Sequence, residues 1–90
     1  MGKVRVLVAD DNKAMRDMLT SMLGAEFDII RAVGDGGAAL TAATQLLPDV
    51  AILDICMPVL NGIEVARRIR YTRTNVGGGF PDRLVGHWYL

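Results

Sequence analysis

Three short apolar segments, each followed by a helical pattern, constrain this chain more than any other feature. The segments cover residues 4–9, 27–33 and 50–53 and begin at intervals of 23 residues. The first and third contain little polar alternation, which is typical of strands that are buried on both faces of a parallel sheet. Repeats of this length join parallel strands by right-handed crossovers. The sequence therefore predicts an α/β fold of three layers, with a parallel sheet between helices.

The segments between the predicted strands carry the signals of helices. Between Asn12 and Gly24, apolar side chains recur at helical spacing and are expected to pack in the core: Met15, Met18, Leu19, Met22 and Leu23. Gly24 is placed to end this helix. Further helices are predicted over 38–47 and 62–70. Three βα units are thus visible in residues 1–70.

The composition bounds the size and the environment of the protein. Ninety residues, 51% of them apolar and 22% charged, are enough for one small globular domain. Ten basic and ten acidic residues balance, so the net charge gives no attraction to nucleic acid or to an anionic membrane. The single cysteine, Cys56, excludes an internal disulfide and suits a reducing cytosol. No apolar run is long enough for a signal peptide or a membrane span, so we expect a cytoplasmic protein.

Acidic residues follow two of the predicted strands. Asp10 and Asp11 come directly after the first strand, and Asp54 ends the third. If these strands are neighbours, the carboxylates converge at one edge of the sheet, where a cation or a proton is needed to relieve their repulsion. Oxygen ligands of this kind suit Mg²⁺, and a carboxylate beside Mg²⁺ can attack a phosphoryl group. Asp is also common at strand ends as a turn or N-cap residue, and spacing alone leaves both interpretations open.

Three motifs resemble the receiver domain of two-component response regulators. They are LVADDN at 7–12, GDGGAAL at 34–40 and PDVAILDICMPVLNGIEVARRIR at 48–70. The last is the most specific, because it combines an apolar strand ending in Asp, a Met-Pro step and an Asn-Gly that opens a helix. The resemblance covers residues 3–70. It implies a doubly wound, flavodoxin-like fold with the strand order 2-1-3-4-5.

The resemblance also implies a role for each acidic residue. Asp54 matches the phosphoacceptor, and Asp10 and Asp11 match the acidic pair that binds Mg²⁺. Asp54 itself and the main-chain carbonyl of Cys56 match the remaining protein ligands of the metal. A histidine kinase or a small phosphodonor would supply the phosphoryl group.

The chain departs from the family pattern after residue 70. A complete receiver has five βα units, which at this repeat would need roughly 115 residues. We find no counterpart of the Ser or Thr that the family places at the end of strand four, or of the Lys at the end of strand five. Residues 71–90 contain a Gly triplet and no sustained periodicity, and an irregular, atypical tail is expected there. The fold is therefore expected to be incomplete, with a partial receiver domain over 1–70.

Truncation of the sheet has consequences for association and output. The third strand would become an exposed apolar edge, and a homodimer is one expected form of association. The LNGIEVARRIR segment resembles regulators that carry a helix-turn-helix output domain. Because these 90 residues contain no such domain, direct binding of nucleic acid by this chain is not expected.

The residues at the predicted strand ends are compatible with three functions to different degrees. The leading prediction is a signalling domain, not an enzyme, that accepts a phosphoryl group on Asp54 with Mg²⁺ and relays the signal by a conformational change. A phosphatase resembling the haloacid dehalogenase family would need a second Asp two residues after the nucleophile, where this chain has Cys56. The alternative is an interaction module or an inactive receiver fragment that is not phosphorylated. His87, the only histidine, has no partner at a useful spacing and is interpreted as incidental.

Overall fold

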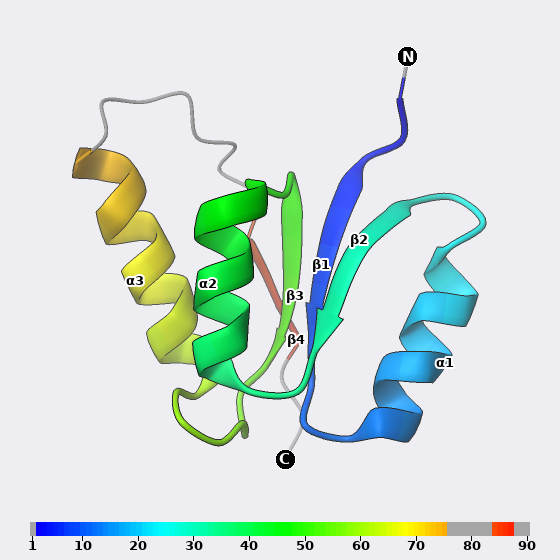
Figure 1. The fold of residues 1–90 in the computed structure, drawn as a ribbon, viewed down its shortest axis with the longest axis horizontal. Coiled ribbons are helices and arrows are strands. Elements are labelled where there is room, and N and C mark those ends of the chain that lie inside the picture. Colours follow the sequence, from blue (N-terminus) through cyan, green and yellow to red (C-terminus); the bar gives the residue numbers. More distant parts are fainter. Residues whose placement is uncertain (1, 76–83, 88–90) are drawn as a thin grey trace.

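A computed structural model describes residues 2–75 and 84–87, and in it a parallel sheet has helices on both faces (Figure 1). The strands are β1 (Arg5–Ala9), β2 (Asp28–Val33), β3 (Val50–Asp54) and β4 (Leu84–His87). The helices are α1 (Lys13–Leu23), α2 (Gly36–Leu46) and α3 (Gly62–Asn75). The strand order is β2-β1-β3-β4, and each pairing is parallel. The predicted α/β fold, with three βα units and the order 2-1-3, is confirmed.

The structure differs from the sequence-based expectation after residue 70. Helix α3 crosses that position and ends at Asn75, and β4 pairs with β3. The prediction that the third strand forms an exposed edge is therefore wrong, and the basis for expecting a homodimer is removed. The remainder of the predicted tail, 76–83 and 88–90, lies outside the described residues. The assignment of 71–90 to an atypical tail stays a prediction.

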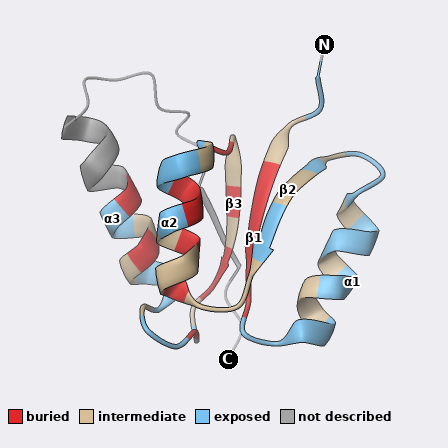
Figure 2. Cartoon of the chain, viewed as in Figure 1, coloured by how far each residue is buried: buried red, intermediate tan, exposed pale blue. Residues whose placement is uncertain are grey.

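The main core lies between the sheet and helices α2 and α3, which cover the same face (Figure 2). Its buried members come from β1, α2, β3, the following loop and α3: Leu7, Ala9, Ala39, Ala42, Ala43, Ala51, Leu53, Met57, Val65 and Ile69. Helix α2 contributes only alanines to this cluster, so its backbone can lie close to the strands. Packing on this face brings α2 against β1 and α3 against β3.

The opposite face of the sheet is covered less completely. Val6 and Val8 are buried there, and α1 packs over β1 and β2. Helix α1 itself has no buried residue, and the side chains of Met18 and Met22 are 47% and 64% exposed. The expectation that these two methionines pack in the core is therefore wrong.

Each helix starts with a side-chain cap. The Oδ1 atoms of Asn12, Asp35 and Asn61 accept hydrogen bonds from the main-chain N–H three residues later, at 3.2, 2.7 and 2.8 Å. Gly24 ends α1 as predicted, but in a right-handed conformation. Within the described part of the chain, none of the helices is long and apolar enough to cross a membrane.

Candidate functional site

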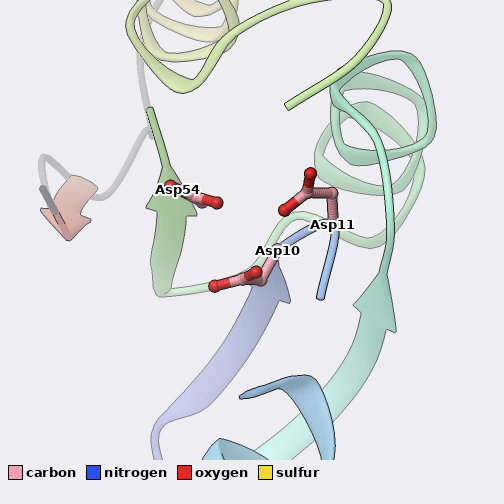
Figure 3. Close-up of side chains that lie close together, drawn as sticks. All are labelled: Asp10, Asp11 and Asp54. Carbon is pink, nitrogen blue, oxygen red and sulfur yellow. The ribbon is translucent and has the colours of Figure 1, made fainter. Parts of the chain in front are cut away.

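The register of β1 and β3 brings the predicted acidic residues together. Ala9 pairs with Leu53, so the residues that follow, Asp10 and Asp54, are neighbours at the carboxyl edge of the sheet. Asp11 continues from β1 into the loop before α1. One carboxylate oxygen from each of the three side chains lies within 4.8 Å of the others. Figure 3 shows the three carboxylates gathered around one point, as the sequence predicts.

Two of the three carboxylates are buried and receive main-chain hydrogen bonds. Asp10 is 2% exposed and Asp54 is 5% exposed, whereas Asp11 lies at the surface. The Asn12 N–H donates to Asp10 Oδ1 at 2.9 Å, and the Cys56 N–H donates to Asp54 Oδ1 at 3.2 Å. Each bond reaches back two residues from the loop after the strand. These bonds restrict the rotation of both side chains and compensate part of the cost of burying them.

The loop between β3 and α3 closes tightly around Asp54. The Gly62 N–H donates to the Ile55 carbonyl at 3.1 Å, so the loop returns to its own start. A Cβ atom at Gly62 would overlap the main-chain oxygen of Asp54, and one at Gly36 would overlap the main-chain oxygen of Leu60. The Gly36 N–H also donates to the Pro58 carbonyl at 3.1 Å. Two glycines therefore allow α3 and α2 to approach the loop that carries the site.

Val59, at the tip of this loop, has a strained main chain. Its φ is 73°, in the left-handed region that β-branched residues disfavour, and its side chain is 79% exposed. A Val59→Asn variant should raise the free energy of unfolding by about 1 kcal/mol, because Asn tolerates this conformation and little burial is lost. Chemical denaturation of both proteins measures the difference.

The matched control for this variant is Val59→Thr. Threonine keeps the branch at Cβ but is polar, so it should give no comparable gain in stability. A gain of equal size in both variants would show that removal of an exposed apolar group, and not relief of strain, stabilises the loop.

The donor chemistry of the acidic cluster fits a hard divalent cation. Carboxylate oxygens are the ligands that Mg²⁺ prefers, and Mg²⁺ commonly keeps several waters while only one or two carboxylates bind it. The exposed position of Asp11 leaves one side of the cluster open to solvent. Cys56 presents an exposed side chain, and the role predicted for its main-chain carbonyl stays a prediction.

Sequence reasoning did not anticipate the position of His87. Strand β4 pairs with β3 in a register that sets His87 opposite Asp54, so its main chain belongs to the same sheet edge. The resemblance implies a Ser or Thr at the end of strand four, and His87 is the last residue of β4. Continuing the 23-residue repeat would place a fourth strand near position 75, where the Gly triplet is unfavourable for a strand, whereas β4 begins at Leu84.

Comparison with known proteins identifies the family. The family model of the response regulator receiver domain matches residues 6–77. The chain belongs to the response regulator receiver domain family, in which domains typically signal and do not act as catalysts on other substrates.

Curated relatives share the motifs but are much longer. The DNA-binding response regulator MtrA of Mycolicibacterium smegmatis is 44% identical over 66 residues, which cover 73% of this chain and 29% of that protein. A protein-glutamate methylesterase/protein-glutamine glutaminase of Nocardioides sp. is 41% identical over 78 residues, covering 84% of this chain and 21% of that protein. The chain thus spans less than a third of the length of these curated relatives.

Solved receiver domains share the fold. The receiver domain of the putative response regulator NarL from Mycobacterium tuberculosis aligns with a TM-score of 0.83 at 32% identity, over 98% of this chain and 68% of that one. The response regulator domain of Thermotoga maritima CheB aligns with a TM-score of 0.82 at 33% identity, over 96% and 60%. A CheX–CheY complex from Borrelia burgdorferi, whose structure contains BeF₃ and Mg²⁺, aligns with a TM-score of 0.81 at 27% identity, over 97% and 63%.

Proposed function

We propose that this protein accepts a phosphoryl group on Asp54, with Mg²⁺ held by Asp10, Asp11, Asp54 and the main-chain carbonyl of Cys56. The observation that carries the proposal is the convergence of three carboxylates within 4.8 Å at the edge of the sheet. Membership of the receiver family and the Mg²⁺ and BeF₃ in the structure of the Borrelia relative support it.

The reaction requires an oxygen nucleophile in a fixed position. A carboxylate oxygen of Asp54 attacks the phosphorus of the donor and forms a new P–O bond. The bond between phosphorus and the leaving group breaks, and the leaving group takes the electron pair. Mg²⁺, when bound, neutralises the charge on the transferred oxygens. The hydrogen bond from Cys56 N–H to Asp54 Oδ1 restricts the rotation of the carboxylate that carries the nucleophile.

The donor and the output follow from the family as proposals. We assign the donor to a histidine kinase or a small phosphodonor in the cytoplasm, and the signal to a conformational change of the domain. The curated relatives include both a DNA-binding regulator and a methylesterase, so similar receivers are linked to different outputs. The receiver segment therefore supplies the input chemistry and does not specify the response.

One observation favours a second candidate, an interaction module that is not phosphorylated. Strand β4 contains no Ser or Thr, and the only lysines in the sequence are Lys3 and Lys13. The groups that the family uses to hold the phosphoryl oxygens after transfer thus lack a counterpart in this sequence. Phosphorylation of the protein distinguishes the two candidates.

Incubation with a small phosphodonor and Mg²⁺, followed by intact mass measurement, tests the proposal. We expect the mass of one phosphoryl group to be added to the wild-type chain and none to Asp54→Ala or to a sample with a chelator. Asp49→Ala is the matched control, because Asp49 precedes β3 at its other end and should not affect labelling. A folded wild-type chain that gains no mass would favour the interaction module.

A further inference from the structure

Arg16 contacts the main chain of the acidic cluster from helix α1. It is half-buried, and its Nη1 atom donates a hydrogen bond to the carbonyl oxygen of Asp10 at 2.9 Å. That carbonyl belongs to the peptide group that joins Asp10 to Asp11. The orientation of this peptide plane determines where the Asp11 side chain starts relative to that of Asp10.

Two other hydrogen bonds hold the main-chain N–H and the Oδ1 atom of Asp10. Its N–H donates to the Val33 carbonyl on β2 at 3.0 Å, and its Oδ1 accepts from the Asn12 N–H at 2.9 Å. The bond from Arg16 fixes the carbonyl in the same way. Asp10 is therefore held at its main-chain N–H, its side chain and its carbonyl by three different segments.

The turn after β2 leaves room for the guanidinium. A Cβ atom at Gly34 would lie 3.0 Å from Arg16 Nη1, closer than ordinary contacts allow. The φ of Gly34 does not lie in the left-handed region, so an alanine there is compatible with the main chain. Gly34→Ala would therefore make the end of the Arg16 side chain shift by a few tenths of an ångström, without changing any charge.

The charge of Arg16 and its hydrogen bond have opposite effects on cation binding. A positive charge beside the cluster repels a divalent cation, so its removal alone should tighten binding. A hydrogen bond that holds the two acidic residues in place should have the reverse effect, because groups that orient metal ligands raise the affinity of the site. The sign of the change on removing Arg16 therefore distinguishes the two roles.

We propose that Arg16 is a positioning residue, which fixes the Asp10–Asp11 peptide plane and so raises the affinity of the site for Mg²⁺. This inference rests on the proposed function, since it takes the acidic cluster to be the Mg²⁺ site. The proposal adds a basic residue of α1 to a site whose other side chains are acidic.

Calorimetric titration of Mg²⁺ into the 90-residue chain tests the inference. Arg16→Met keeps much of the aliphatic stem, and we expect it to weaken Mg²⁺ binding about tenfold. Gly34→Ala should also weaken Mg²⁺ binding. Lys13→Met is the matched control for charge: Lys13 is exposed and pairs with Asp17 at 2.8 Å, so its loss should change the affinity by less than about twofold.

Circular dichroism of the metal-free proteins shows whether the variants fold. Weaker binding by folded Arg16→Met and Gly34→Ala supports the inference. Equal or tighter Mg²⁺ binding by Arg16→Met overturns the inference and leaves the proposed function intact. Loss of the fold in both variants has the same consequence, because Arg16 would then be a purely structural residue. A folded wild-type chain that does not bind Mg²⁺ contradicts the proposed metal site itself.

Discussion

The Gly36→Ala variant is expected to lose most of its stability. A methyl group on the first residue of α2 would overlap the main-chain oxygen of Leu60, and a main-chain atom cannot move aside as a flexible side chain can. Relief of the overlap requires α2 to separate from the loop that follows β3, which breaks the hydrogen bond from Gly36 N–H to Pro58 O. We expect a loss of more than about 3 kcal/mol, a large part of the stability of a small domain.

The neighbouring substitution Gly37→Ala is the matched control. Its Cβ would lie 3.2 Å from side-chain atoms of Asp35 and Val59, which can shift, and alanine favours the helix. Urea denaturation should therefore show a change within about 1 kcal/mol for Gly37→Ala. Equal stabilities of the Gly36 and Gly37 variants would show that the close approach of α2 to the loop is not required for the fold.

Asp10→Asn should remove at least about half of the stabilisation of the protein by Mg²⁺, because a tenfold loss of affinity lowers it to about 1.4 kcal/mol at a Mg²⁺ concentration a hundredfold above the wild-type Kd. At this concentration, binding to the folded state adds about 2.7 kcal/mol to the free energy of unfolding of the wild type. The amide keeps the size of the side chain and can still accept the hydrogen bond from Asn12 N–H, so the metal-free fold should persist. The charge that attracts the cation is lost, and we expect affinity to fall by more than tenfold.

Thermal unfolding with and without Mg²⁺ measures this effect. Asp17→Asn serves as the control, because Asp17 is an exposed acidic residue of α1 that pairs with Lys13 and does not belong to the cluster. The Asp17→Asn variant should show the same increase in unfolding temperature with Mg²⁺ as the wild type. If Asp10→Asn also retained the full shift, Mg²⁺ would be stabilising the protein at another location.

The sequence predicts the fold well where local signals and long-range packing agree. Buried strands at regular intervals indicate the parallel sheet, and Asn and Asp residues mark the helix starts. The methionines of α1 follow the helical period, yet Met18 and Met22 are exposed, because periodicity shows which residues share a face and not whether another layer covers it. Strand β4 was missed because its four residues, Leu84–His87, include a glycine and fall outside the repeat.

The acidic site was predicted more fully than the residues that support it. Asp10, Asp11 and Asp54 follow strands, and the topology of a parallel sheet is sufficient to bring them together. The roles of Arg16 and Gly36 depend on contacts with the Asp10 and Leu60 carbonyls, which lie on other segments. Val59 carries no sequence signal of its strain, since a left-handed conformation is expected at Gly or Asn and not at valine.

Chemical identification of the phosphorylated residue tests whether Asp54 is the phosphoacceptor. After incubation with a small phosphodonor and Mg²⁺, borohydride reduces an aspartyl phosphate to the corresponding alcohol, and mass spectrometry of peptides locates it. We expect this conversion at Asp54 alone, and only when both Mg²⁺ and the donor are present. Conversion at Asp10 or Asp11, or none in a folded protein, would contradict this expectation.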